Sequence, residues 1–190
     1  MAAQRRAGVR QLLALVADLD DHRIPPLARG LLRMLVTQLH ALEDAIAELD
    51  RQLLAIARTD PLTRSLCEVP GVGPIIATAF TATVPDASGF RSGRHLAAWI
   101  GLVPAQHATG GKPRLLGISK RGDGYLRRQL IRGARSVVRV AASGRTGRLC
   151  AWIRELLARR PYNVVVAAVA NKLARIIWAM LVRGEAYRAA

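Results

Sequence analysis

Three hydroxyl side chains, Ser92, Thr109 and Ser119, occur in a strongly basic stretch of the 190-residue sequence. A hydroxyl oxygen can attack a phosphodiester when nearby Lys and Arg side chains stabilise the attacking oxygen and the charge that develops on phosphorus. Lys112 and Arg114 follow Thr109 closely in the chain. The residue types therefore allow covalent chemistry on a phosphate, with each of the three hydroxyls a candidate nucleophile.

Metal-dependent and nucleotide-cofactor chemistry have little support in the sequence. Residues 61–190 contain five acidic side chains that are scattered along the chain, so no carboxylate cluster for metal ions is expected. The four histidines and two cysteines lack the spacing of metal ligands, and the isolated thiols indicate a reducing cytoplasm. The sequence contains no phosphate-binding loop or dinucleotide motif. It predicts a cytoplasmic protein with no metal site and no cofactor in this chain.

The positive charge is concentrated in one part of the sequence. Residues 1–60 hold eight arginines and eight acidic residues, whereas residues 61–190 hold 21 Lys and Arg against five acidic residues. The whole net charge of +16 therefore lies in the second part. An arginine-rich proteome would explain the scarcity of lysine but not this segregation. Neutralisation of phosphates does explain it, so the charge predicts a nucleic-acid partner.

One predicted helix, beginning near Gly124, concentrates this charge on one side. Its arginines are spaced by four, three and four residues, which places them on one face of a helix. Its apolar residues form the opposite face, which is expected to be buried. Like charges at this spacing destabilise a helix slightly, so phosphates alongside would favour it. A membrane-surface helix is the alternative, although it would usually carry more Trp and Phe. The four arginines are Arg128, Arg132, Arg135 and Arg139.

Two shorter segments are further candidates for phosphate contact. Gly71 and Gly73 occur in a Pro-Gly-Val-Gly-Pro sequence whose pattern resembles a helix-hairpin-helix turn, in which backbone N–H groups point at a phosphate. The alternative is that the same residues form an ordinary tight turn. Lys120 and Arg121 directly precede the arginine-rich helix. Residues 104–117, rich in glycine and proline, predict a flexible basic loop or a small hairpin.

The remaining elements are predicted to be helical, so the fold class is mainly α. Apolar residues repeat in heptads over the long helix that ends at Asp60-Pro61, which predicts a coiled-coil-like seam that pairs either with a copy of itself or within a helical pair. Short helices are expected over residues 9–20 and 90–101, and later ones over 149–157 and 162–181. The apolar stretch 164–182 is interrupted by polar residues, which favours a buried helix over a membrane span. The seam residues are Leu35, Leu39, Leu42, Ile46, Leu49, Leu53 and Ile56.

The ordered motifs resemble one protein family. The chain reads VPGVGP from Val69, FRSGRHLAAWIGLVP from Phe90, GGK from Gly110 and GISKRGDGYLRR from Gly117. It continues with RPYNV at residues 160–164 and ANKLARIIW at residues 170–178. This series resembles the insertion-sequence "IS one-ten" transposases of the IS116/IS110/IS902 type, which include the Piv-type DNA invertases.

The resemblance implies a domain order and a set of partners. Such transposases have an N-terminal RuvC-like domain with an acidic site for Mg²⁺, a coiled-coil linker, and a C-terminal transposase domain with a catalytic serine. They recombine DNA as oligomers, and some are guided by a structured bridge RNA. By this resemblance, residues 1–26 are the remnant of the first domain, 27–60 the coiled-coil linker and 61–190 the transposase domain. The expected partners are DNA, a guide RNA and further copies of the chain, with no membrane.

Two departures from the family pattern bear on function. The acidic RuvC-like domain has no counterpart in these 190 residues, and relatives read His-Ser-Ser-Gly-Gly where this chain reads His107-Ala-Thr109-Gly-Gly. Threonine keeps the hydroxyl but adds a methyl group, which hinders attack and restricts rotation. The expectation is a truncated, non-autonomous transposase part that binds DNA. The alternatives are a stand-alone nucleic-acid-binding regulator without catalysis and, as a poorer fit to the motifs, a ribosome-associated RNA-binding protein.

Overall fold

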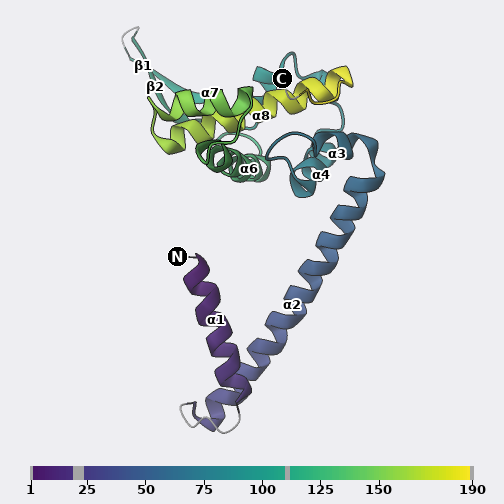
Figure 1. The fold of residues 1–190 in the computed structure, drawn as a ribbon, viewed down its shortest axis with the longest axis vertical. Coiled ribbons are helices and arrows are strands. Elements are labelled where there is room, and N and C mark those ends of the chain that lie inside the picture. The colour runs from purple at the N-terminus through teal and green to yellow at the C-terminus, as the bar shows by residue number, and fades with distance from the viewer. Residues whose placement is uncertain (1, 19–23, 110–111, 189–190) are drawn as a thin grey trace. The chain divides into compact units, whose positions relative to one another are not determined.

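The structure is a computed structural model that describes residues 2–18, 24–109 and 112–188. It is mainly α-helical, as the sequence predicts, with one small two-stranded sheet in the described part (Figure 1). The chain divides into two compact units, Met1–Gln52 and Leu53–Ala190. Nearly all of the buried apolar residues belong to the second unit.

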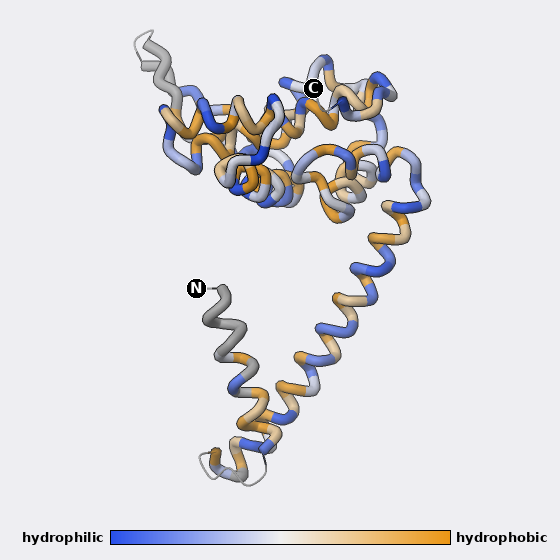
Figure 2. Tube along the Cα trace, in the orientation of Figure 1, coloured by the Kyte–Doolittle hydropathy of each residue, from blue (hydrophilic) through white to orange (hydrophobic). Residues whose placement is uncertain are grey.

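The first unit consists of helix α1, Ala2–Ala17, and most of helix α2, Pro26–Thr59. Helix α1 begins earlier than the predicted 9–20 and ends three residues sooner. Pro26 is the first residue of α2, a position where the missing N–H of proline costs nothing. Apolar and polar residues alternate regularly along the 34 residues of α2 (Figure 2). Five of its seven seam residues are exposed, among them Leu42 at 62% and Ile46 at 58%.

The second unit contains the remaining helices and the sheet. In chain order these are α3 (Pro61–Leu66), α4 (Pro74–Thr83), the 3₁₀ helix η1 (Ala87–Gly89), α5 (Gly93–Trp99), β1 (Pro104–Thr109), β2 (Lys112–Ile118), α6 (Gly124–Ala142), α7 (Arg148–Leu157) and α8 (Tyr162–Arg183). Strands β1 and β2 pair antiparallel, with an irregularity between Pro104 and Gln106. Residues 104–109 and 112–118, predicted as a basic loop or small hairpin, therefore form the two arms of this small sheet.

Helix α8 is the centre of the second unit and packs against α5, α6 and α7 (Figure 1). By length and composition it is also long and apolar enough to cross a membrane. In this unit it buries one side in the core, as expected for a buried helix. The residues of that side are Val165, Val166, Val169, Ala170, Leu173, Ala174, Ile177 and Met180.

Helix α5 is shorter than the predicted 90–101 because both of its ends are fixed by local bonds. The Ser92 hydroxyl accepts a hydrogen bond from the His95 N–H at 3.3 Å and caps the start. At the other end, Gly101 adopts a φ of 80°, a conformation that favours glycine. The following Leu102 N–H donates back to the Ala97 carbonyl at 2.9 Å, which closes the helix.

Candidate nucleic-acid interface

Helix α6 separates a buried apolar side from an exposed basic side. Its first turn is capped by Asp123, whose carboxylate accepts a hydrogen bond from the Leu126 N–H at 2.8 Å. Leu126, Leu130, Ala134 and Val138 are fully buried in the core of the second unit. The arginines lie on the other side and are all exposed, as their spacing predicts. We call these four residues, Arg128, Arg132, Arg135 and Arg139, the α6 arginine face.

Arg127 belongs to the same helix but has a different role. Its guanidinium donates to the Ile100 carbonyl at 2.8 Å and to the Arg121 carbonyl at 3.0 Å. These bonds join the start of α6 to the end of α5 and to the turn that precedes α6. Sequence periodicity excludes Arg127 from the arginine face, but it does not show that this side chain holds the turn in place.

The turn before α6 places two more cations at the start of the helix. Lys120 has a φ of 57°, which is unusual for a residue with a side chain, and its N–H donates to the Gly101 carbonyl at 3.2 Å. A Cβ at Gly122 would lie 1.7 Å from the Trp99 carbonyl oxygen, so this position requires glycine. Lys120 and Arg121 are therefore held, both exposed, at the N-terminal end of the α6 arginine face.

The Pro-Gly-Val-Gly segment connects α3 to α4 and packs against α6. Gly71 has a φ of 80°, and a Cβ there would lie 2.8 Å from the Gly133 carbonyl oxygen. A Cβ at Gly133 would in turn lie 2.1 Å from the Gly71 carbonyl oxygen. Both positions thus need glycine for close packing of backbone on backbone. Gly73, half-buried, precedes the first turn of α4, and the phosphate contact proposed for Gly71 and Gly73 stays a prediction.

The candidate catalytic residue lies at the tip end of the hairpin. Thr109 is the last residue of β1 and pairs with Lys112, the first residue of β2, while Arg114 pairs with His107. The part of the chain that the structure describes leaves out Gly110, Gly111 and the side chains of these four paired residues. Their predicted roles stay predictions. The other two hydroxyls are described: Ser92 caps α5, and the Ser119 N–H donates to the Val103 carbonyl at 2.8 Å.

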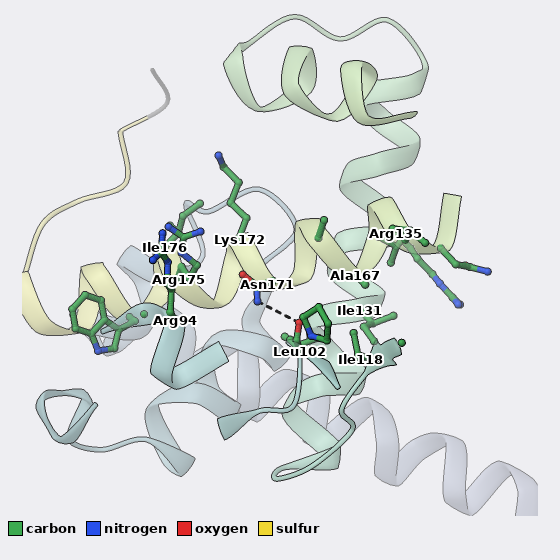
Figure 3. A pocket seen from close by; sticks show the side chains of 18 of the residues that line it. Arg94, Leu102, Ile118, Ile131, Arg135, Ala167, Asn171, Lys172, Arg175 and Ile176 are labelled. Carbon is green, nitrogen blue, oxygen red and sulfur yellow. Dashed lines mark hydrogen bonds between the residues drawn. The ribbon is translucent and has the colours of Figure 1, made fainter. Parts of the chain in front are cut away.

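The structure also brings together cations that sequence patterns did not connect. A groove of about 1300 Å³ is lined by residues of α5, α6, α7 and α8 and of the inner end of the hairpin (Figure 3). Its charged residues are Arg94, Arg135, Lys172 and Arg175. They are up to 81 positions apart in the sequence, so no local spacing could have grouped them. Among the described residues, no three His, Cys, Asp or Glu side chains lie close enough together to hold a metal ion.

The fold and these surfaces define a mainly α-helical protein with an exposed basic face on one of its core helices. The family model described as the transposase IS116/IS110/IS902 family matches residues 63–147. The chain belongs to this transposase family. The match runs from within α3 through α4, α5 and the two strands to α6, the helix that carries the α6 arginine face.

Several curated relatives match almost the whole chain. A "Probable family 20 transposase" of Pseudomonas aeruginosa is 50% identical over 96% of this chain and 54% of its own length. The transposase for insertion sequence element IS1111A of Coxiella burnetii is 41% identical over 93% of this chain and 48% of the relative. That for IS1328 of Yersinia enterocolitica is 37% identical over 95% and 54%, respectively. The chain thus spans about half the length of the curated relatives it matches.

Proposed function

We propose that these 190 residues bind DNA through the α6 arginine face and so provide the DNA-binding part of an insertion-sequence transposase. The observation that carries the proposal is the exposure of four arginines on the side of α6 opposite its buried residues. Lys120 and Arg121 extend this face at the start of the helix. Phosphates are the partner that such a face would neutralise, and neutralising them releases counterions into solution.

The experiment is a titration of labelled duplex DNA with the chain at several salt concentrations. Each phosphate contact should contribute about 0.9 to the fall of log affinity with log salt. Reversing three charges, with Arg128→Glu, Arg132→Glu and Arg135→Glu, should reduce affinity on all sequences alike and flatten that salt dependence. A matched control carries Arg64→Glu, Arg159→Glu and Arg160→Glu, which change the net charge equally on other exposed positions. A flat salt response, or equal losses in both variants, would contradict the proposal.

Strand exchange is proposed for a complete protein rather than for these residues alone. Because the chain spans about half the length of its relatives, we propose that recombination also needs the other half, on the same chain or in trans. By resemblance that half would hold Mg²⁺, and a structured guide RNA would be a further partner. Robust recombination of donor and target DNA by the 190 residues, with or without guide RNA, would contradict non-autonomy.

Thr109 is proposed to occupy the position of the catalytic serine of relatives. In the complete protein its hydroxyl oxygen would attack a DNA phosphodiester, with the basic residues of the hairpin stabilising the charge on phosphorus. A bond would form between the Thr109 oxygen and phosphorus, the bond from phosphorus to one sugar oxygen would break, and that oxygen would leave as a hydroxyl carrying the proton lost by Thr109. Thr109→Ser removes the hindering methyl group and should increase strand exchange, whereas Thr109→Ala should abolish it. If Thr109→Ala recombines as well as the unaltered protein, the hydroxyl has no catalytic role.

The seam of α2 is proposed to join copies of the chain. Its exposed residues follow a heptad repeat, and burying such a repeat against a second helix is the usual basis of a coiled coil. The proposed assembly is therefore a homo-oligomer formed through α2. Sedimentation of the chain, with and without acidic substitutions on the seam, tests this assembly.

A further inference from the structure

The groove beside α8 is lined by apolar side chains, which we call its floor, and by cationic side chains. The floor includes Leu102, Ile118, Ile131 and Ile176, from the connection between α5 and β1, the end of β2, α6 and α8, respectively. Two tryptophans, Trp152 and Trp178, also line it. A volume of about 1300 Å³ exceeds that of a typical pocket for one small molecule, so it suits a longer ligand.

The charge of the groove has one sign. Arg94, Lys172 and Arg175 come from the start of α5 and from α8, where a Cβ at Gly93 would lie 3.0 Å from the Arg175 Cα. Arg135, from α6, is labelled on the opposite side of the view in Figure 3. Among the described residues that line the groove, none is acidic. Arg135 is also a member of the α6 arginine face, so the two basic surfaces share a residue.

Three polar or aromatic side chains of the groove are fixed by contacts. The Lys172 ammonium lies 4.5 Å from the centre of the Trp152 ring, which holds this charge at the groove wall. The Trp178 Nε1–H donates to the Ala87 and Phe90 carbonyls, at 3.2 Å each. The Asn171 Nδ2–H donates to the Leu102 carbonyl at 3.3 Å, the bond drawn in Figure 3. The Asn171 Oδ1 atom is thereby left to accept a hydrogen bond from a ligand.

We propose that this groove binds an unpaired segment of nucleic acid. Its phosphates would contact Arg94, Lys172 and Arg175, and its bases would lie over the apolar floor and the tryptophan rings. A duplex keeps its bases stacked inside, so its bases cannot reach the floor, and we expect a duplex to bind through the α6 arginine face instead. Basic grooves with aromatic and apolar walls are the general means by which proteins hold single strands. The inference rests on the proposed function and adds a second site, in which the strand is unpaired.

The experiment compares a single strand with a duplex of the same mixed sequence, as fluorescent probes for the full 190-residue chain. The double variant Arg94→Gln and Arg175→Gln leaves the α6 arginine face intact. We expect single-strand affinity to fall about tenfold or more, and its salt dependence to flatten by about 1.4 log units per log salt for two lost phosphates. Duplex affinity should stay within about twofold. The matched control, Arg159→Gln and Arg160→Gln, removes the same charge outside the groove.

A second variant fills the groove without changing its charge. Ala167 lines the groove and is half-buried, so Ala167→Phe adds bulk at its wall. Single-strand affinity should fall while duplex affinity and the thermal unfolding midpoint stay close to those of the unaltered chain. Parallel DNA and RNA single strands show which nucleic acid is the better ligand.

The outcomes separate this inference from the proposed function. If the unaltered chain binds neither probe, the proposed function fails. If the chain binds duplex but the groove variants lose no more single-strand affinity than the control, the groove assignment alone is wrong. If the groove variants instead change the sedimentation of the chain and leave both affinities unchanged, the groove contacts protein and the assignment is again overturned.

Discussion

Helices α2 and α6 each separate apolar from charged residues along their length, and they differ in which side is covered. In α6 the second unit buries the apolar side and leaves the arginine face exposed. In α2 the apolar seam itself is exposed, with Leu35 at 59%, Leu42 at 62% and Leu49 at 58%. The same kind of sequence pattern therefore presents two different surfaces.

The charges of α2 and α6 also indicate that the two helices present different surfaces. Those of α2 are balanced, and Glu48 pairs with Arg51 at 2.6 Å and accepts a hydrogen bond from Gln52 at 2.8 Å. Such a surface offers little to a phosphate, whereas its exposed leucines lose water-accessible area when another helix covers them. The α6 arginine face, in contrast, offers cations to phosphates and no leucine seam to another helix. We infer that α2 serves contacts with protein and α6 contacts with nucleic acid.

The largest expected effect comes from one methyl group added to α6 at Gly133. Gly133→Ala in α6 would place a Cβ 2.1 Å from the Gly71 carbonyl oxygen, which is backbone and cannot easily move. We expect the free energy of unfolding of the second unit to fall by about 3 kcal/mol or more. Denaturant unfolding followed by circular dichroism measures this change.

The matched control is Gly30→Ala in α2. A Cβ at Gly30 meets no atom within 4 Å, and alanine in a helix is more stable than glycine by about 0.5–1 kcal/mol. The same substitution should therefore stabilise α2 slightly and destabilise α6 strongly. Equal effects at the two positions would show that the contact between Gly71 and Gly133 does not limit packing.

The next effect concerns association through the seam of α2. Leu42→Glu and Leu49→Glu together should weaken self-association by at least about 100-fold, since each leucine contributes about 1.5–3 kcal/mol when it is fully buried. Analytical ultracentrifugation would detect the shift toward monomer, and the unfolding of the second unit should not change. The control carries Ala41→Glu and Ala47→Glu, exposed positions off the seam. A chain that is monomeric before any substitution would contradict the proposed role of α2.

Local sequence patterns predicted the elements that depend on neighbours in the chain. The 3.6-residue period places α6, α7 and α8 within a few residues of their observed ends, and it separates the buried side of α6 from Arg128 and Arg132. The Asp60-Pro61 pair correctly marked the end of α2. The start of α1 was missed because its first turns lack a clear apolar period.

Contacts between distant residues could not be read in this way. The approach of Gly71 to Gly133 joins positions 62 residues apart, and each glycine is explained only by the backbone of the other. The groove brings Arg94, Arg135 and Arg175 from three helices to one surface. The spacing of these three arginines along the chain does not predict that they line one groove. Thr109 was singled out through its family resemblance, because a single hydroxyl has no pattern of its own.

The smallest expected effect lies where α2 ends, at the cap that begins α3. The Asp60 carboxylate accepts hydrogen bonds from the hydroxyl of Thr63 and from its N–H, the latter at 2.7 Å, and these bonds lower the pKa of Asp60 below its usual range. The buried Thr63 hydroxyl also lies 3.3 Å from that of Thr81 in α4. The Thr63 hydroxyl therefore joins the charged cap of α3 to Thr81 in α4.

The sign of the pH dependence follows from that lowered pKa. A carboxylate whose pKa is lower in the folded state contributes stability above its unfolded pKa of about 3.9, and this contribution is lost as pH falls through the folded value. Asp60→Asn should therefore be slightly less stable than the unaltered chain at pH 6, and the difference should shrink as pH is lowered toward 3. Denaturant midpoints measured across this range test the expectation. A difference that stays constant with pH would show that the charge of Asp60 is not what stabilises the junction, and the hydrogen-bond geometry alone would then account for the start of α3.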